Sequence, residues 1–367
     1  MAKISSFQVP PGSCSVGVRV IDTTSAITVP LDMVTPVIKG HEILQCPSFA
    51  FLIEHPSGRK LLFDLGVRKD WENLPPVVVN HIKQDGWKLS VRQGVHEILD
   101  EHGVAAKDIE AIIWSHWHYD HTGDPSVFPA SAALIVGPGF KETFLPGYPE
   151  RAESPILQSD VAGREVRELD FKDAASTLQV GRFHAVDCFG DGSFFILDSP
   201  GHTLGHICAL ARVTVSPASF IFMGGDCCHH LGEMRPSAYL PLPDSIFPNP
   251  LEPETAMPCP GALFEHLLRD GDRARPFYGQ MRPGMILCDP DVADETIEKA
   301  QEADGTGSVM VVIAHDSHML GKIDFFPKYA NDFLAQGWVE ETRWAFLEDF
   351  KDAIPSGSET LQQHVKL

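Results

Sequence analysis

The feature that most constrains this chain is a cluster of imidazoles and one carboxylate directly after an apolar run. The run Ala111–Trp114 is followed by Ser115-His116-Trp117-His118-Tyr119-Asp120-His121. Protonated imidazoles so close together would repel one another, and the cluster gains nothing from packing. Nitrogen and oxygen ligands of this kind suit Zn²⁺ or a similar first-row metal. Because residues i and i+2 of an extended segment face the same way, His116 and His118 can reach one metal, and a turn would send Asp120 and His121 toward a second.

Short apolar or alternating runs bounded by turn residues predict many β-strands. They are 16–21, 49–54, 60–63, 111–115, 133–136, 193–197, 207–213, 218–223 and 309–313. Helices are predicted over 289–303 and 327–351, and from the helical spacing of Val91, Val95 and Ile98. Strands in two blocks with interspersed helices predict a layered α/β fold.

At these residues the sequence resembles the metallo-β-lactamase superfamily, through its His-x-His-x-Asp-His signature. Four further segments resemble family motifs in family order: Leu61–Gly66, Ser199–His206, Phe222–Asp226 and Val311–Asp316. The resemblance covers roughly residues 45–320. It implies an αββα sandwich, in which two mixed sheets pack face to face, helices cover the outside and the metals sit at one edge. We expect a single domain over residues 1–367.

The resemblance also assigns a set of metal ligands by position. It gives His116, His118 and His202 to one metal and Asp120, His121 and His315 to the other, with Asp226 bridging both. Asp64 is expected to fix a ligand-bearing loop. The implied cofactors are two Zn²⁺ ions, with iron or manganese as alternatives.

The chemistry that the resemblance implies is hydrolysis. Two cations lower the pKa of a shared water, so hydroxide exists near neutral pH and attacks a carbonyl group. Asp120 is expected to carry a proton to the leaving group. In the lactonase branch of the family a tyrosine lies three residues after the bridging aspartate, and here His229 occupies that position. Two roles are open for His229: a hydrogen-bond donor to an oxyanion, or a surface histidine.

The motif spacing and the Ala314-His315-Asp316 ending resemble the N-acyl homoserine lactonase branch most. The expected reaction is therefore the opening of a cyclic ester of an apolar or aromatic small molecule. Hydrolysis of a lactam or cyclic carbamate, of an acyl thioester or of a phosphotriester are alternatives on the same site. A metal-binding oxidoreductase and a non-catalytic metal module are alternatives from other classes.

A long segment separates Asp226 from His315, and we treat residues 227–285 as an insertion. Its stretch Arg235–Pro260 carries eight prolines in 26 residues, which predicts an ordered but irregular loop. We expect this insertion to form part of the substrate pocket or a lid, with an inert surface insertion as the alternative. The early segment 27–45 is expected to form another wall or to mediate contacts of a homodimer.

Charge and composition exclude several partners. The net charge of −21 disfavours nucleic acid and anionic lipid surfaces. Apolar runs are too short to span a bilayer, and the first residues do not form a signal peptide. The eight cysteines include no C-x-x-C pair and are read as reduced thiols. A cytoplasmic enzyme acting on a small-molecule substrate is the resulting expectation.

Overall fold

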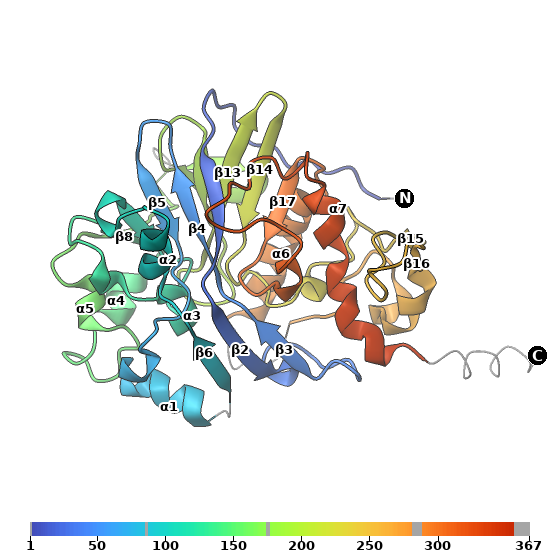
Figure 1. The fold of residues 1–367 in the computed structure, drawn as a ribbon, viewed down its shortest axis with the longest axis horizontal. Helices are drawn as coiled ribbons and strands as arrows, with labels where there is room; N and C mark the ends of the chain where they lie inside the picture. The colour runs from blue at the N-terminus through green and yellow to red at the C-terminus, as the bar shows by residue number, and fades with distance from the viewer. Residues whose placement is uncertain (1, 85–86, 174–176, 281–287, 356–367) are drawn as a thin grey trace, which may run out of the picture.

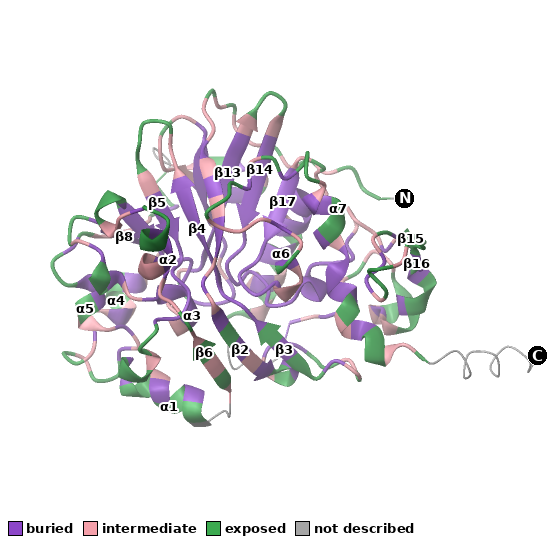
Figure 2. Ribbon diagram, in the orientation of Figure 1, coloured by how far each residue is buried: buried purple, intermediate pink, exposed green. Residues whose placement is uncertain are grey.

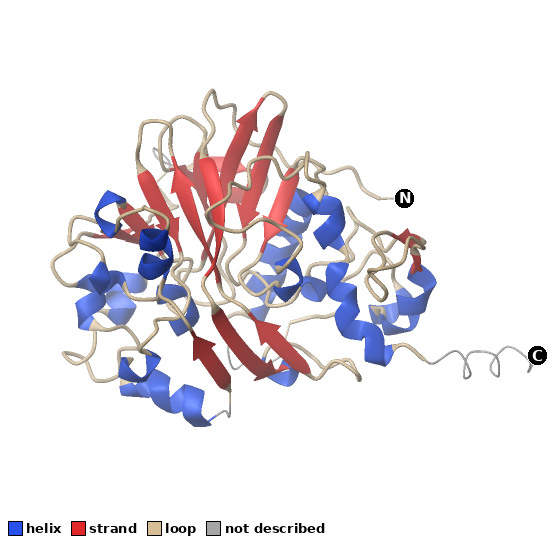
Figure 3. Ribbon diagram, viewed as in Figure 1, coloured by secondary structure: helices blue, strands red, loops and turns tan. Residues whose placement is uncertain are grey.

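Two six-stranded sheets form the framework of the protein in the computed structural model, which describes residues 2–84, 87–173, 177–280 and 288–355. The sheets lie face to face, and helices flank them on both outer sides (Figures 1 and 3). This is the αββα arrangement that the resemblance implies, so the predicted fold class is confirmed.

The first sheet has the order β1-β4-β5-β7-β8-β9. Its strands are β1 (Gly17–Asp22), β4 (Phe49–Glu54), β5 (Lys60–Phe63), β7 (Ala111–Ile113), β8 (Ala133–Val136) and β9 (Val166–Glu168). β1, β4 and β5 pair antiparallel, whereas β5, β7, β8 and β9 run parallel. Because parallel strands end at the same edge, the loop after β5 with Asp64 lies beside the histidine-rich loop after β7. The Asp64 N–H donates to the carbonyl oxygen of Ile113 at 2.8 Å.

The second sheet has the order β10-β11-β12-β13-β14-β17. Its strands are β10 (Leu178–Val180), β11 (Phe183–Asp187), β12 (Phe194–Asp198), β13 (Ile207–Val215), β14 (Ala218–Met223) and β17 (Val309–Val312). Only the pair β14 and β17 is parallel among these described strands, with Met223 opposite Val312. The loops that follow these two strands therefore leave the sheet at one edge, which brings Asp226 close to His315.

Both faces of each sheet are covered, which explains why the strands read as nearly continuous apolar runs. In β13, Ala209 and Ala211 face the core between the sheets, whereas Cys208 and Leu210 face the outer core of the second sheet. In β4, Leu52 packs under the helices of the first sheet. The central strands of the two sheets are accordingly mostly buried (Figure 2).

The helices are short apart from α6. They are α1 (Pro76–Gln84), α2 (Val95–Glu101), α3 (Tyr119–Thr122), α4 (Phe140–Phe144), α5 (Gln158–Val161), α6 (Pro290–Asp304) and α7 (Trp338–Arg343). α2 and α4 pack on the first sheet, and α6 packs Ile297 and Ala300 on the second. Asp289 begins α6 because its carboxylate accepts the N–H groups of Asp291 and Val292. No described helix has the length and apolar composition that crossing a membrane requires.

Several elements differ from the sequence-based expectation. A small third sheet, β3-β2-β6, was not predicted; it contains β2 (Ser25–Pro30), β3 (Ile43–Cys46) and β6 (Lys88–Val91). The helix predicted over 327–351 is wrong for 327–337, where proline follows Phe326 and Gly337 adopts a φ of +71°. Only α7 and the 3₁₀ segment Ala345–Ala353 are helical in that region.

The described part of the insertion, residues 227–280, is ordered and contains little regular structure. Its strands β15 (Ser245–Ile246) and β16 (Cys259–Pro260) form a two-stranded ribbon at the side of the molecule (Figure 1). Leu242, Ile246 and Phe264 are buried in the outer core of the second sheet. Residues 281–285 of the insertion lie outside the described residues, and its role as a pocket wall or lid stays a prediction.

Candidate metal centre

The seven side chains predicted as metal ligands converge at one edge of the two sheets. His116, His118, Asp120 and His121 come from the loop and short helix after β7; the others follow β12, β14 and β17, and they are His202, Asp226 and His315. They form two groups of closely spaced ligand atoms: His116, His118, His202 and Asp226, and Asp120, His121 and His315. The sequence and the fold therefore bring together every residue of the predicted set.

In the first group three ring nitrogens face one another. His116 Nε2 lies 2.9 Å from His118 Nδ1, and His202 Nε2 lies 3.1 Å from each of them. Asp226 Oδ2 is 3.6 Å from His202 Nε2 and 3.8 Å from His116 Nε2. Two ligands of a tetrahedral zinc ion with bonds of about 2.0–2.1 Å lie about 3.3 Å apart, so this spacing suits such an ion.

The second group meets the other oxygen of the same carboxylate. His121 Nε2 and His315 Nε2 each lie 3.1 Å from Asp226 Oδ1. Asp120 Oδ2 is 3.8 Å from His121 Nε2 and 3.6 Å from His315 Nε2. Asp226 Oδ1 faces the second group, and Oδ2 faces the first group and also lies 3.2 Å from His315 Nε2, so the carboxylate lies between the two groups as a bridging ligand would.

Hydrogen bonds on the far side of two rings select, for each neutral ring, the tautomer whose inner nitrogen can bind a metal. His315 Nδ1–H donates to the carbonyl oxygen of Pro47 at 2.6 Å, and His121 Nδ1–H donates to Asp64 Oδ2 at 2.9 Å. A neutral imidazole then presents a bare Nε2. Within the described ranges, His121 Nε2 and Asp226 Oδ1 are buried and have no hydrogen-bond partner. Buried lone pairs that face one another are costly unless a cation lies between them, so these residues fit divalent metals.

Two other side-chain groups fail the same test. They are His41, His230 and Asp349, and Cys14, His55 and Asp191. His230 Nδ1 accepts the Gly232 N–H at 2.9 Å, and His55 Nδ1 accepts the Ser57 N–H at 3.1 Å. In a neutral ring the proton must then sit on Nε2, where it is donated to Asp349 and Asp191, respectively. Both groups are hydrogen-bonded clusters rather than metal sites.

Polar groups outside the ligand set hold the ligands in place. Asp64, predicted in this role, accepts the Ser115 N–H on Oδ1 at 2.6 Å and His121 on Oδ2. His206 donates from Nδ1 to the Ser199 carbonyl at 2.8 Å and accepts the Asp226 N–H on Nε2 at 3.1 Å. For the support by His206, the sequence signal was its place as the closing residue of the Ser199–His206 motif. The support by the Pro47 carbonyl had no sequence signal.

The loop that carries His202 depends on a glycine. Gly201 has a φ of +128°, and a Cβ on it would lie 2.3 Å from the backbone nitrogen of Ala293 in α6. The loop can therefore approach the beginning of α6 only because residue 201 has no side chain.

His229 is buried against the centre, so the surface-histidine alternative is wrong. Its exposed fraction is 5%, and its Nε2 lies 3.6 Å from Asp226 Oδ2. Its ring lies 4.9 Å from that of His202 and is nearly parallel to that of His315, at 6.0 Å. Burial lowers the pKa of His229 to about 4, so the ring is neutral at pH 7 and has one N–H to donate.

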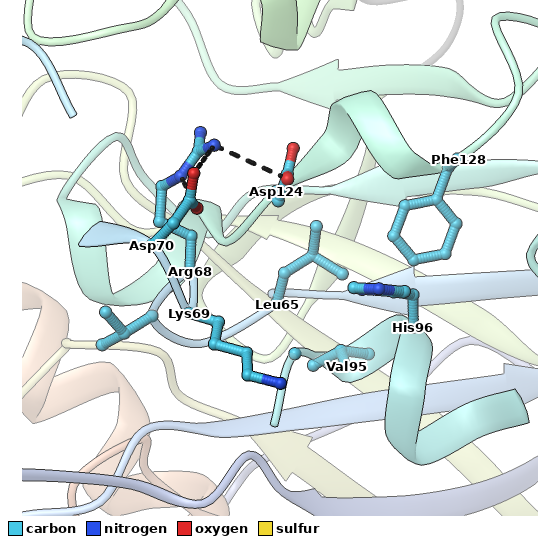
Figure 4. A pocket seen from close by; sticks show the side chains of 10 residues that line it. Leu65, Arg68, Lys69, Asp70, Val95, His96, Asp124 and Phe128 are labelled. Carbon is cyan, nitrogen blue, oxygen red and sulfur yellow. Dashed lines mark hydrogen bonds and ion pairs between the residues drawn. The ribbon is translucent and has the colours of Figure 1, made fainter. Parts of the chain in front are cut away.

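A small cavity lies beside the loops that carry Asp64 and His121. It has a volume of about 40 Å³, and Leu65, Arg68 and Asp124 are among its lining residues (Figure 4). The Leu65 N–H donates to the His121 carbonyl, and Arg68 pairs with Asp124 at 3.6 Å. The cavity contains none of the predicted site residues, and its ion pair ties together the loops after β5 and β7.

The chain is similar to several known proteins. Residues 43–213 match the family described as the metallo-beta-lactamase superfamily. A protein named gamma-lactamase FDB1 from Fusarium pseudograminearum is 46% identical over 361 residues, which are 95% of this chain and 87% of that protein. A protein named metallo-hydrolase mfmC from Annulohypoxylon moriforme is 42% identical and covers 94% of this chain and 90% of its own length. A solved N-acyl homoserine lactone hydrolase has the same fold, with a TM-score of 0.55 at 15% identity, covering 87% of this chain and 99% of that one.

Proposed function

The chain belongs to the metallo-β-lactamase superfamily and is a hydrolase, and on that premise we propose that it opens the ring of a small cyclic amide, with a γ-lactam as the first candidate substrate. The single observation that carries the proposal is the convergence of two ligand groups on the two oxygens of Asp226. The name of the FDB1 relative supports the amide as the scissile bond.

Both groups have the donor chemistry of a dinuclear centre. His116, His118 and His202 would hold one cation, and Asp120, His121 and His315 the other, with Asp226 between them. Two Zn²⁺ ions are proposed, because imidazole nitrogens with carboxylate oxygens suit this metal; iron and manganese are the alternatives. When bound, such cations lower the pKa of water and polarise a carbonyl oxygen.

The residues of the chain supply the remaining requirements of ring opening. A neutral His229 is placed to donate a hydrogen bond to an oxygen that gains negative charge beside Asp226. The nitrogen of an amide leaves only if it receives a proton, and the Asp120 carboxyl is the side chain proposed to carry it. At 13% exposure, the Asp120 side chain is more open than those of His121 and His315.

A cyclic ester is the second candidate. The same ligand groups and the same His229 would act on an ester carbonyl, and an alkoxide leaves more readily than an amine. The proton delivered by Asp120 would then matter less. The dependence of the rate on Asp120 therefore separates the two candidates.

The test uses a γ-lactam and a γ-lactone with the same ring substituent. Hydrolysis by the metal-loaded enzyme is followed chromatographically, before and after chelator treatment and metal restoration. We expect chelator-sensitive turnover of the lactam, and Asp120→Asn should lower lactam kcat far more than lactone kcat while both metals stay bound. His184→Ala, an exposed histidine on β11, is the matched control and should behave as wild type. Protein that holds two metals and opens neither ring would reject the proposal.

A further inference from the structure

The loop that carries His229 takes its shape from hydrogen bonds among its own residues. The N–H groups of His229 and His230 both donate to Glu233 Oε1, each at 3.0 Å, and His230 Nδ1 accepts the Gly232 N–H. The His229 ring contributes no such bond: across the described residues its Nδ1 has no partner. The position of this ring beside Asp226 therefore depends on where the whole loop is held.

One carboxylate from the C-terminal part of the chain holds this loop from outside. Asp349 lies in the 3₁₀ segment Ala345–Ala353, and its Oδ2 accepts the Nε2–H of His230 at 3.1 Å. The contact joins residues 119 positions apart in the sequence. It lies among aromatic rings, because the His230 ring packs against Phe346 and Phe350, at 5.4 Å and 6.0 Å.

The other oxygen of Asp349 holds the turn after β17. His318 Nε2 lies 3.3 Å from Asp349 Oδ1, and His318 Nδ1 lies 3.5 Å from Asp316 Oδ1. Although burial opposes it, the hydrogen bonds to Asp316 and Asp349 raise the pKa of His318 to about 10, so the ring is a cation at pH 7. Asp316 directly follows His315. Through His318, the Asp349 carboxylate therefore anchors the segment that carries a proposed metal ligand.

A third histidine near Asp349, His41, carries no charge at pH 7. His41 Nε2 lies 3.8 Å from Asp349 Oδ2, and His41 Nδ1 shares a hydrogen bond with the Tyr278 hydroxyl at 2.7 Å. Burial lowers the pKa of His41 to about 4. Asp349 thus pairs with the His318 imidazolium and accepts a hydrogen bond from His230 Nε2–H.

We propose that Asp349 is a positioning residue for the reaction: through His230 and His318 it sets the loops on which His229 and His315 stand. The near-parallel stacking of the His229 and His315 rings, at 6.0 Å and 6°, is the arrangement that it maintains. The proposal rests on the proposed function, in which His229 faces the reacting carbonyl. It also places a determinant of the site in a segment outside residues 43–213, which match the family.

The test compares Asp349→Asn with Asp352→Asn. Both changes remove one carboxylate from the same segment, but Asp352 is exposed. A displacement of a reacting or catalytic group by about 1 Å can lower the rate by up to about 100-fold. Asp349→Asn should therefore lower kcat by about 10- to 100-fold, while KM stays within about threefold of the wild-type value and the metal content is unchanged. The Asp352→Asn control should match wild type. An unchanged kcat, or loss of metal in Asp349→Asn, would overturn the proposal.

A double-mutant cycle separates positioning from a general structural role. Because the path through His229 is lost once its ring is removed, adding Asp349→Asn to a His229→Ala background should lower kcat by a smaller factor than it does in the wild-type background. If the two losses multiply, the proposal is wrong.

Hydrogen exchange of the 229–233 amides gives a readout that does not need turnover. Asp349→Asn should speed this exchange and Asp352→Asn should not, even if no ring substrate is hydrolysed and the proposed function fails. If Asp349→Asn folds poorly, His230→Phe removes the same hydrogen bond, together with the one accepted from the Gly232 N–H, while keeping an aromatic ring. It should reproduce both the loss of kcat and the faster exchange, and wild-type values in both would reject the proposal.

Discussion

Replacing Asp64 by asparagine changes which nitrogen of His121 carries the proton. Asp64 accepts the Ser115 N–H at 2.6 Å and His121 Nδ1–H at 2.9 Å. Asparagine has one oxygen and one amide N–H₂. The Ser115 backbone N–H can only donate, so it takes the oxygen, and the amide N–H₂ then faces His121. His121 Nδ1 can accept only if its proton moves to Nε2, and the bare nitrogen opposite Asp226 is lost.

The expected loss of metal affinity follows from the role of Asp64 as the hydrogen-bond partner of a proposed metal ligand. Losing the group that orients a metal-bound histidine costs about 10- to 100-fold in metal affinity. This corresponds to about 1.4–2.7 kcal/mol. The loss should fall on the group of Asp120, His121 and His315, because the described hydrogen bonds of Asp64 reach His121 and no ring of the first group. Asp64 has a φ of +61°, which asparagine also tolerates, so backbone strain should add little.

The assay is a chelator competition that resolves two metal affinities per chain. Asp64→Ala is the companion variant, since it leaves both buried donors unpaired, at about 1–3 kcal/mol each, but does not force the proton of His121 to move. Asp64→Ala should therefore lower the melting temperature more than Asp64→Asn, and Asp64→Asn should weaken the second metal more. If both affinities stay at wild-type values in Asp64→Asn, or fall equally, the argument from the His121 proton is refuted.

Three further predictions concern stability. Burial raises the pKa of Glu233 to about 8, above its unfolded value. Wild type should therefore lose stability as the pH rises from about 4.5 through 8. Glu233→Gln should lack this loss in urea titrations at pH 5, 7 and 9. Asp304→Asn should destabilise by about 3–5 kcal/mol in thermal unfolding, because it leaves the buried Arg235 guanidinium without its carboxylate, now at 2.6 Å. Gly137→Ala should cost about 1–3 kcal/mol in the same assay, because the new Cβ would lie 1.9 Å from the Gly205 carbonyl oxygen; equal stability would show that the two loops can separate.

The strands that carry the site were the best predicted part of the fold. β4, β5, β8, β12, β13, β14 and β17 lie within one or two residues of their expected bounds. These strands are buried on both faces, so their apolar runs are long and bounded by turn residues. The strands of the third sheet were not predicted. In the case of β6 (Lys88–Val91), exposed and half-buried residues alternate, and its apolar Val91 was assigned to a helix instead.

The C-terminal region failed for a different reason. Trp344, Leu347 and Phe350 have the spacing of an amphipathic helix, and they are indeed buried. Burial, however, does not determine the helix type: Leu347 and Phe350 lie in the 3₁₀ segment Ala345–Ala353, which follows α7 after Trp344, and residues 327–337 before α7 are not helical. The three side chains face the core in either case.

The sequence by itself indicated the donor set of the candidate metal centre: a strand followed by His116, His118, Asp120 and His121 suits metal binding, and the family resemblance added His202, Asp226 and His315. Only the tertiary structure decided what holds those donors. The partners of His315 and His230 are the Pro47 carbonyl and Asp349, which lie 268 and 119 positions away. A backbone carbonyl and an isolated aspartate have no sequence signature, because any residue can supply the first and a surface residue commonly supplies the second. The folding of distant loops onto one sheet edge gives them their roles, since it fixes which ring nitrogens carry protons and which remain free for a cation.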